Sequence, residues 1–402
     1  MSNRQKATLL PQLRFPDFRK MPEWEEKRIG DFLNESRLPG NKGNVAKKLT
    51  VKLWGNGVFG KSELIQGSIN TQYFRRKAGQ FIYSKLDFLN QAFGVIPSHL
   101  DGFESTVDLP CFDIADGLDP LFLLEYVKRK EFYERLGETA DGSRKARRIH
   151  AETFQSFSLV LPPPAEQRKI ADCLSSLDEL IAAQVRKVDA LKTHKKGLMQ
   201  QLFPREGETQ PRLRFPEFEG GKAWTVGKLG NIAANLDNRR VPITSGDREA
   251  GAIPYYGASC VVDYVKDFIF NEDLLCVSED GANLLARTCP IAFPISGKTW
   301  VNNHAHVLKF ERPCTQKFIE IYLNSIKLDD FITGMAQPKL NKAMLDSIPI
   351  PHPDVPEQQR VADCITALDK LITAELEGLG DLKTHKQGLM QQLFPNLDSG
   401  ES

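Results

Sequence analysis

The sequence lacks the features that would place this chain in a membrane or in a disulfide-stabilised fold. No stretch of its 402 residues reaches the roughly 18 consecutive apolar residues that a membrane-spanning helix needs. Residues 1–13 contain no apolar core of signal-peptide length. The seven cysteines are an odd number without a Cys-x-x-Cys pair, which is typical of free thiols in a reducing compartment. These absences predict a cytoplasmic protein without a membrane segment.

Signatures of DNA-modifying and hydrolytic enzymes are missing as well. The sequence has no adenine-methylase tetrapeptide of the NPPY or DPPF type, no convincing Asp…Glu-x-Lys nuclease triad and no nucleophile elbow. It also has no excess of one charge, because 53 Lys and Arg against 52 Asp and Glu leave a net charge of +1. Any surface that binds nucleic acid must therefore be local.

What the sequence does contain is one module written twice. The triplet Ala-Asp-Cys at 171–173 returns 191 residues later at 362–364, and the stretch 191–195 returns at the same spacing. A second repeat, at a spacing of 200, relates Leu-Arg-Phe-Pro-Asp-Phe at 13–18 to Leu-Arg-Phe-Pro-Glu-Phe at 213–218. The ends of the module are copied closely, whereas its middle has diverged. A shared frame with two different inserts is expected of a protein that presents two different binding surfaces.

Each copy of the module ends in a stretch with the heptad spacing of a coiled coil. Apolar residues recur at alternating steps of four and three, and a polar residue interrupts both copies at Gln184/Glu375 and at Lys195/Lys386. Each stretch predicts a helix of about 38 residues. The predicted helix-pairing seam comprises Ile170, Leu174, Leu177, Ile181, Gln184, Leu191, Val361, Ile365, Leu368, Ile372, Glu375 and Leu382. Antiparallel pairing would give the tandem repeat a pseudo-two-fold axis and could join Gln184 to Glu375. Two unrelated amphipathic helices are the alternative.

The two inserts have the composition of mixed, strand-rich domains. Their clearest strands are expected at 49–53, 80–83 and 301–310, and their clearest helices at 120–136 and 315–332. The predicted fold class is therefore α+β, with two such domains joined by a pair of long antiparallel coiled-coil helices.

Basic residues cluster with polar and aromatic ones in both inserts. Lys and Arg can hold phosphates, whereas Asn, Gln and Arg can read base edges, although such clusters also occur on solvated loops. The candidate DNA contacts in the first insert are Lys47, Lys48, Lys61, Gln72, Tyr73, Arg75, Arg76, Lys77, Arg144, Lys145, Arg147 and Arg148. Those in the second insert are Asn238, Arg239, Arg240, Tyr255, Tyr256, Lys298, Trp300, Gln337, Lys339, Asn341 and Lys342.

Two local patterns suggest other chemistry. Residues 55–62 satisfy the P-loop pattern GxxxxGK[ST], so a nucleotide-binding enzyme is an alternative function. A P-loop needs a helix that begins near Ser62, and the Gly67-Ser68 pair leaves little room for one, so we favour a loop-shaping turn. His304 and His306 alternate on a predicted strand without an acid or cysteine at suggestive spacing, so we interpret them as structural. No metal site is predicted.

The order of these motifs resembles the specificity subunit of type I restriction-modification systems. Leu-x-Phe-Pro-x-Phe with a following Trp, an insert, Pro-x-x-x-Glu-Gln and a long helix ending in Gly-Leu-Met-Gln-Gln-Leu-Phe-Pro are all present twice. Residues 161–167 and 350–358 resemble the family's junctions between insert and helix, and 334–341 resembles the loop that closes its target-recognition domains. Residues 146–150 stand at the equivalent place in the first insert with a different sequence, so the role of Gln337 is not carried over.

The resemblance implies a DNA-binding subunit that takes part in defence against foreign DNA. Its two inserts would read the halves of a bipartite, asymmetric site in double-stranded DNA. Its helices would set the spacer and dock two methylase and two restriction subunits, which use S-adenosylmethionine, ATP and Mg. This chain would carry no active site of its own, in line with the missing catalytic motifs, and would hold no cofactor. The implied domains are 1–160 and 206–349 for target recognition, with long helices at 161–205 and 350–402. A third possible function is an assembly rod whose inserts bind protein.

Overall fold

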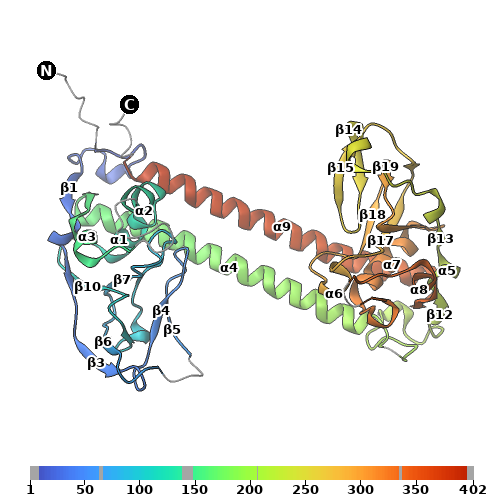
Figure 1. Cartoon of the computed structure of the whole chain (residues 1–402), viewed down its shortest axis with the longest axis horizontal. Helices are drawn as coiled ribbons and strands as arrows, with labels where there is room; N and C mark the ends of the chain where they lie inside the picture. The colour runs from blue at the N-terminus through green and yellow to red at the C-terminus, as the bar shows by residue number, and fades with distance from the viewer. Residues whose placement is uncertain (1–8, 63–66, 138–147, 206, 335–336, 396–402) are drawn as a thin grey trace. The chain divides into compact units, whose positions relative to one another are not determined.

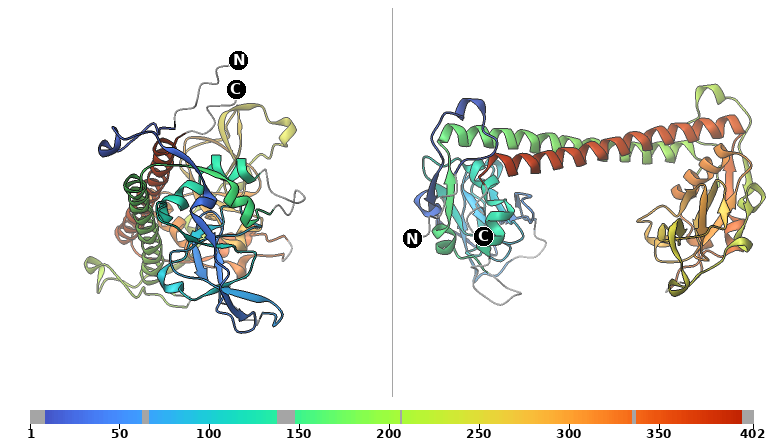
Figure 2. Two further views of the ribbon diagram at one scale, coloured as in Figure 1. Left: turned by 90° about the vertical axis from the view of Figure 1, so that its left-hand side faces the viewer. Right: turned by 90° about the horizontal axis from the view of Figure 1, so that it is seen from above.

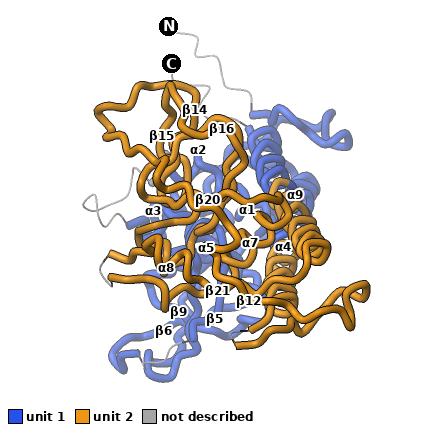
Figure 3. Tube along the Cα trace, turned by 90° about the vertical axis from the view of Figure 1, so that its right-hand side faces the viewer, with its two compact units in different colours: residues 1–185, 378–402 blue, residues 186–377 orange. Residues whose placement is uncertain are grey.

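The computed structural model describes residues 9–62, 67–137, 148–205, 207–334 and 337–395. The described residues divide into two compact units (Figure 3). Unit 1 comprises those within Met1–Val185 and Gly378–Ser402, and unit 2 those within Arg186–Glu377. Among the described residues, no helix is long and apolar enough to cross a lipid bilayer. All seven cysteines lie in the described part of the chain as free thiols.

Unit 1 is built on a four-stranded antiparallel sheet (Figure 1). Its strands follow the order β2 (Leu33–Glu35), β10 (Cys111–Ile114), β7 (Phe81–Tyr83) and β8 (Phe93–Val95). Smaller sheets pair β1 (Glu25–Arg28) with β11 (Ser158–Leu161), β4 (Leu49–Val51) with β5 (Val58–Gly60), and β6 (Gln72–Arg75) with β3 (Pro39–Lys42) and β9 (Glu104–Ser105). The short helices are α1 (Pro120–Val127), α2 (Lys130–Gly137) and α3 (Ala151–Ser156).

Unit 2 repeats the same central sheet. Its order is β13 (Ala234–Asn235), β20 (Ala305–Lys309), β17 (Leu274–Ser278) and β18 (Ala292–Ile295), again antiparallel throughout. A two-stranded sheet pairs β12 (Thr225–Lys228) with β21 (Pro349–His352). The outer sheet holds β15 (Val261–Val265), β14 (Ala250–Tyr256), β19 (Lys298–Val301) and β16 (Phe270–Asn271). The short helices are α5 (Leu229–Ile232), α6 (Asn283–Ala286), α7 (Pro313–Ser325) and α8 (Lys342–Ser347). The frame is thus conserved between the units, whereas the outer strands differ.

Two long helices, α4 (Pro164–Leu202) and α9 (Val355–Leu393), each begin in one unit and end in the other. In unit 1 the start of α4 and the end of α9 lie side by side (Figure 2), with Lys386 Nζ 2.6 Å from the Asp178 carboxylate. In unit 2, Lys195 is 2.5 Å from Asp369 and Lys187 is 2.7 Å from Glu375. Because higher numbers on one helix face lower numbers on the other, the two helices run antiparallel, as predicted.

The ion pairs between the helices account for the interruption at Lys195/Lys386 and, through Lys187, for Glu375 at the other interruption. Lys195 and Lys386 are repeat equivalents, and so are their partners Asp369 and Asp178, so the same pair occurs once in each unit. At the other interruption, the Gln184 side chain lies close to Gly378 in unit 1. Its Nε2 is 3.8 Å from the position that a Cβ atom on Gly378 would occupy. The predicted seam residues are buried or half-buried. The bond between Gln184 and Glu375 stays a prediction.

The closely copied ends of the module complete the hydrophobic cores. Unit 1 buries Phe394, which follows α9, against Trp24 and Phe122 with ring centroids 6.3 and 5.4 Å away. Unit 2 buries Phe203, which follows α4, against Trp224 at 6.3 Å. The core of each unit therefore needs the end of a helix that begins in the other unit, which accounts for the fidelity of the Gln-Gln-Leu-Phe-Pro repeat.

Several predicted elements are shorter than expected. The helix expected at 120–136 is broken into α1 and α2, and the one expected at 315–332 ends at Ser325 and is followed by a 3-10 turn, Asp329–Phe331. The strand expected at 301–310 is interrupted by a turn that leaves β19 and β20 as separate strands. Apolar spacing identified these segments, but the residues at the breaks, 128–129, 302–304 and 326–328, include no glycine or proline that would mark a turn.

Candidate nucleic-acid interface

A bidentate ion pair fixes each insert to the start of its long helix. Arg14 donates to both carboxylate oxygens of Glu166 at 2.8 and 2.7 Å, and Arg214 does the same to Glu357 at the same distances. The hydrogen bonds to Glu357 raise the pKa of the Arg214 guanidinium. Both glutamates lie in the first turn of their helix, where the helix dipole favours an acidic side chain. Their burial beside arginine shows that they also hold in place the repeated segment that opens each module, residues 13–18 or 213–218, which we call the entry segment.

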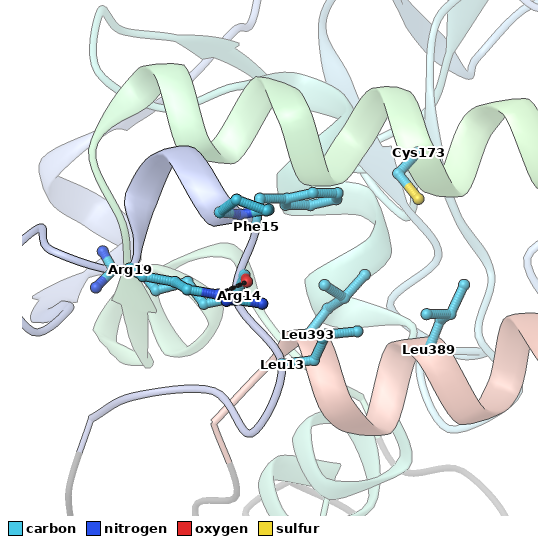
Figure 4. A pocket seen from close by; sticks show the side chains of 8 residues that line it. Leu13, Arg14, Phe15, Arg19, Cys173, Leu389 and Leu393 are labelled. Carbon is cyan, nitrogen blue, oxygen red and sulfur yellow. Dashed lines mark hydrogen bonds between the residues drawn. The ribbon is translucent and has the colours of Figure 1, made fainter.

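An apolar pocket of about 160 Å³ lies beside the Arg14 pair in unit 1 (Figure 4). Phe15 and Leu13 line it from the entry segment, and Cys173 and Leu389 line it from α4 and α9. The surrounding groups are mostly hydrocarbon and offer no set of catalytic side chains. The pocket therefore belongs to the frame that carries the inserts.

Two basic residues of unit 1 that are neighbours in sequence lie in opposite environments. Arg75 is exposed at the end of β6, whereas Arg76 is 2% exposed. The Arg76 guanidinium donates to the Ser36 carbonyl at 2.6 Å and to Ser105 Oγ at 2.8 Å. Burial lowers the pKa of this guanidinium. Arg76 thus ties segments of unit 1 together, whereas the side chain of Arg75 is exposed to solvent.

The remaining candidates of unit 1 divide in the same way. Lys48 is buried with its ammonium 5.6 Å from the centre of the Tyr73 ring, and Gln72 Nε2 donates to the Gly40 carbonyl at 2.9 Å. Lys47, Lys61, Lys77 and Arg148 are exposed. Arg144, Lys145 and Arg147 lie outside the described residues.

The segment with the P-loop pattern forms a β-hairpin. Strands β4 and β5 pair antiparallel, from Val51 opposite Val58 to Leu49 opposite Gly60. Gly55 and Gly57 take the turn between them with φ of +67° and +86°, which glycine adopts without steric cost. Lys61 and Ser62 follow a strand instead of opening a helix, as far as the described residues go. This geometry contradicts the P-loop alternative, because a P-loop connects a strand to a helix N-terminus.

The hairpin also presents residues that the sequence analysis missed. Trp54 is 63% exposed at its tip, and Phe59 is 43% exposed with the Lys52 ammonium 4.3 Å from its ring centre. Unit 2 has a similar pair, with the Lys298 ammonium 4.9 Å from the centre of the exposed Phe268 ring. Aromatic residues beside a Gly-Asn-Gly turn were the available signal for Trp54 and Phe59.

In unit 2, two of the predicted clusters meet around one carboxylate. Glu279, just after β17, is 2.6 Å from Arg240 and 3.2 Å from Lys339. The closing loop that carries Lys339 is tied to the same place, because the Leu340 N–H donates to the Glu279 carbonyl at 2.7 Å. Residues 240 and 339, far apart in sequence, are thereby held together at the end of the central sheet.

The two histidines of unit 2 differ from the expected pair on one face. His304 is exposed in the turn before β20 and lies 2.8 Å from Asp280. His306 is 1% exposed, with Nδ1 2.6 Å from Asp237 and 3.7 Å from Glu279. Ligand atoms of Asp237, Glu279 and His306 lie within 4.8 Å of one another. Arg240 and Lys339 already pair with these carboxylates, so the cluster suits an internal ion network better than a metal ion.

The other candidates of unit 2 have mixed surroundings. Tyr255 is 1% exposed with its hydroxyl 3.1 Å from the Ile243 amide, and the Trp300 indole donates to the Val241 carbonyl at 2.7 Å. Arg239 pairs with Glu272, and Lys342 pairs with Asp346. Asn341 caps α8 by accepting from the Met344 N–H at 3.0 Å. Tyr256 is half-buried, and Asn238, Lys298 and Gln337 are exposed.

Comparison with known proteins shows which proteins this chain resembles. Residues 221–380 match the model of the type I restriction modification DNA specificity domain. Over 143 residues the chain is 35% identical to a putative type I restriction enzyme specificity subunit of Haemophilus influenzae, a match that covers 36% of this chain and 37% of that relative. It is 23% identical over 413 residues to the type I restriction enzyme MjaVIII specificity subunit of Methanocaldococcus jannaschii, with 93% of each chain covered.

The fold agrees with the sequence matches. The crystal structure of the type I restriction-modification S subunit from M. genitalium aligns with a TM-score of 0.59 over 96% of this chain and 100% of that one, at 15% identity. Structural similarity along nearly the whole of both chains, at this low sequence identity, shows a shared fold. Residues 221–380 thus match the type I restriction modification DNA specificity domain, and the chain is similar in sequence to type I restriction enzyme specificity subunits and shares the fold of one.

Proposed function

We propose that this chain selects the DNA site of a type I restriction-modification complex without catalysing a reaction itself. Unit 1 reads one half of a bipartite, asymmetric site, and unit 2 reads the other half. Helices α4 and α9 set the nonspecific spacer between the halves. Two methylase subunits dock on these helices and methylate adenine with S-adenosylmethionine, and two restriction subunits add ATP- and Mg-dependent translocation and cleavage.

The observation that carries this proposal is the same central sheet with different surroundings. The strand order β2-β10-β7-β8 of unit 1 matches β13-β20-β17-β18 of unit 2. Outside this frame, unit 1 has a three-stranded sheet and a hairpin, whereas unit 2 has a four-stranded outer sheet. Binding the same sequence twice would favour two similar surfaces. Divergence confined to the outer parts instead favours two different half-sites on one scaffold.

The charges of the exposed residues suit contacts with a duplex. Arg75, Lys77 and Arg148 of unit 1 are exposed cations, and Lys52 and Lys298 lie over exposed aromatic rings. Cations of this kind bind phosphates and make affinity depend on salt. In unit 2, ion pairs with Glu272 and Glu279 hold Arg239 and Arg240 in fixed positions, which favours base-edge or phosphate contacts of defined geometry.

Selection from a random DNA library tests the proposal directly. The purified chain, with its methylase subunits, is mixed with duplexes that carry a long randomised segment, and the bound fraction is sequenced. We expect the enriched duplexes to share two short motifs at a fixed separation. A single contiguous motif would show that only one of the two units recognises a DNA sequence. A bound fraction without any shared motif would refute sequence selection.

The two alternatives predict different results in the same experiments. An assembly rod whose inserts bind protein predicts no DNA affinity even with methylase subunits present. A nucleotide-binding enzyme predicts ATP binding by the isolated chain that Lys61→Ala abolishes. The hairpin geometry of residues 55–62 opposes this second alternative, and equilibrium dialysis with ATP completes the test.

A further inference from the structure

A carbonyl at the end of the closing loop is held by a buried donor in each unit. In unit 2, His306 Nε2 lies 2.7 Å from the carbonyl oxygen of Leu340. In unit 1, the Tyr83 hydroxyl donates to the carbonyl oxygen of Ile149 at 3.0 Å. Ile149 and Leu340 are repeat equivalents, 191 residues apart. The same backbone position is therefore fixed by two chemically different side chains.

The backbone around these two carbonyls supports their equivalence. The N–H of Ile149 donates to the Lys85 carbonyl at 3.1 Å, and the N–H of Leu340 donates to the Glu279 carbonyl at 2.7 Å. Both acceptors lie two residues or fewer beyond equivalent strands of the two central sheets, β7 and β17, and a short helix, α3 or α8, follows each anchor. We call Ile149 and Leu340 the loop anchors of units 1 and 2.

The two ring nitrogens of His306 both face hydrogen-bond acceptors. A peptide carbonyl can only accept, and Nε2 faces that of Leu340. Nδ1 lies 2.6 Å from the Asp237 carboxylate. Burial alone would raise the pKa of Asp237, but the hydrogen bond and charge of His306, the Val307 N–H and Arg240 outweigh it and lower that pKa. The carboxylate is therefore ionised, and a neutral imidazole would leave one nitrogen lone pair facing an acceptor at 2.6 or 2.7 Å.

The other charged groups around His306 form ion pairs with one another. Arg240 contacts Asp237 at 3.4 Å and Glu279 at 2.6 Å, and Lys339 contacts Glu279 at 3.2 Å. Burial raises the pKa of the nearby Cys276 thiol, which stays neutral. Within this network His306 is the member that needs a second proton to donate on both sides, to Asp237 and to the Leu340 carbonyl. Imidazole is also the side chain whose charge generally changes near neutral pH.

From this geometry we propose that His306 is a positioning residue whose doubly protonated ring holds the closing loop of unit 2 in its DNA-reading position. Raising the pH then releases the Leu340 anchor and weakens recognition by unit 2. The Ile149 anchor of unit 1 is unaffected, because burial raises the pKa of the Tyr83 hydroxyl far above its ordinary value and the donor keeps its proton. The part of this inference that concerns DNA rests on the proposed function.

Hydrogen–deuterium exchange of the full chain tests the anchors without DNA. Peptides covering 337–345 and 148–156 are followed from about pH 5.5 to 9, a range that brackets imidazole titration, with each rate divided by the intrinsic rate at that pH. We expect protection of 337–345 to fall roughly tenfold across a single titration step, as for loss of a charge-assisted hydrogen bond. The 148–156 peptide should show no such step.

Three variants separate positioning from a merely structural role. Asp237→Asn removes the carboxylate that favours the doubly protonated ring, so the step should move to lower pH. His306→Gln should abolish the step, and Tyr83→Phe should loosen 148–156 equally at every pH. A wild-type chain without a step, equal steps in both peptides, or an unmoved step in Asp237→Asn would overturn the inference. The wild-type and Asp237→Asn profiles decide it even if His306→Gln fails to fold.

DNA binding then tests the consequence for recognition. The probes are the duplex recovered from the library selection and two versions of it with one half scrambled. Binding that depends on the unit 2 half should weaken as the pH rises, while the contribution of the unit 1 half stays constant. If no DNA binds, the proposed function fails and the exchange result still stands. An exchange step accompanied by equal pH dependence of both halves would contradict the reading role of the loop.

Discussion

At the scale of single residues, the structure separates cations that stabilise the fold from cations that are free to face solvent. Sequence could not make this distinction for Arg75 and Arg76, because both belong to one basic cluster. Arg75 is exposed at the end of β6, whereas the buried guanidinium of Arg76 donates to Ser36 and Ser105, which come from distant parts of unit 1. The same holds for His306, whose acidic partners Asp237 and Glu279 come from distant parts of the chain.

The Arg75 and Arg76 pair gives a matched test of this separation. Arg75→Gln should change the free energy of unfolding by less than about 0.5 kcal/mol and reduce the slope of log K against log salt by roughly 0.9, as expected for one lost phosphate contact. Arg76→Gln should instead destabilise unit 1 by about 2 kcal/mol, because buried carbonyls lose their donor. Urea unfolding and salt-dependent DNA binding measure the two effects. An unchanged salt slope in Arg75→Gln would remove it from the interface.

A second matched pair concerns the lysines of the helix seam. Lys386 reaches the buried Glu125 of α1 at 3.0 Å as well as Asp178, whereas its repeat equivalent Lys195 pairs with the half-exposed Asp369. Lys386→Met should therefore cost about 2 kcal/mol of stability and Lys195→Met less than about 1 kcal/mol. Thermal unfolding of both variants checks this, and equal losses would show that Glu125 contributes nothing.

The titration of the Lys386 cluster sets the pH range of that contribution. Burial alone would lower the pKa of Lys386, but Glu125 and Asp178 outweigh it and raise that pKa. Burial would likewise raise the pKa of Glu125, but Lys128 and Lys386 lower it. The stabilisation is thus full at neutral pH, is lost on the acidic side as Glu125 protonates below its ordinary value, and is lost on the alkaline side as Lys386 deprotonates above its ordinary value. The difference in unfolding free energy between wild type and Lys386→Met should shrink in both directions.

At the scale of elements, the repeat and the heptad spacing predicted most of the frame. They located both long helices, their polar interruptions and the core positions at their ends, because packing against a partner helix imposes a strict period. The outer strands were less predictable, since they are short and their pairing is set by contacts distant in sequence. The hairpin at residues 49–60 shows the limit, because its glycine turn satisfies a nucleotide-binding pattern by coincidence.

If α4 and α9 set the length of the DNA spacer, then lengthening both helices should lengthen the preferred spacer. Inserting four residues at equivalent exposed places in both helices adds about one turn, or roughly 6 Å. Since one base pair advances the duplex by about 3.4 Å, the preferred spacer should change by roughly two base pairs. Library selection with the extended chain measures the new spacing. A spacer identical to that of the parent chain would contradict the claim that the helices set its length.

At the scale of the whole molecule, two copies of one frame carry two different surfaces. Each unit is completed by the last residues of a helix that begins in the other unit, so neither core is complete without the tandem repeat. This arrangement suits a protein that must present both surfaces together. It also explains why the copied segments are those that build the cores and junctions, while the candidate DNA contacts lie in the diverged middles.

The most direct test of this account is the adenine methylome of the host with and without this chain. The account predicts that deletion removes methylation at one bipartite motif and leaves other methylated motifs unchanged. Restoring a chain in which Arg75 is replaced by Gln should return the same motif at reduced occupancy. A methylome that is identical before and after deletion, in a host that expresses the partner methylase, would contradict the claim that this chain selects a DNA site.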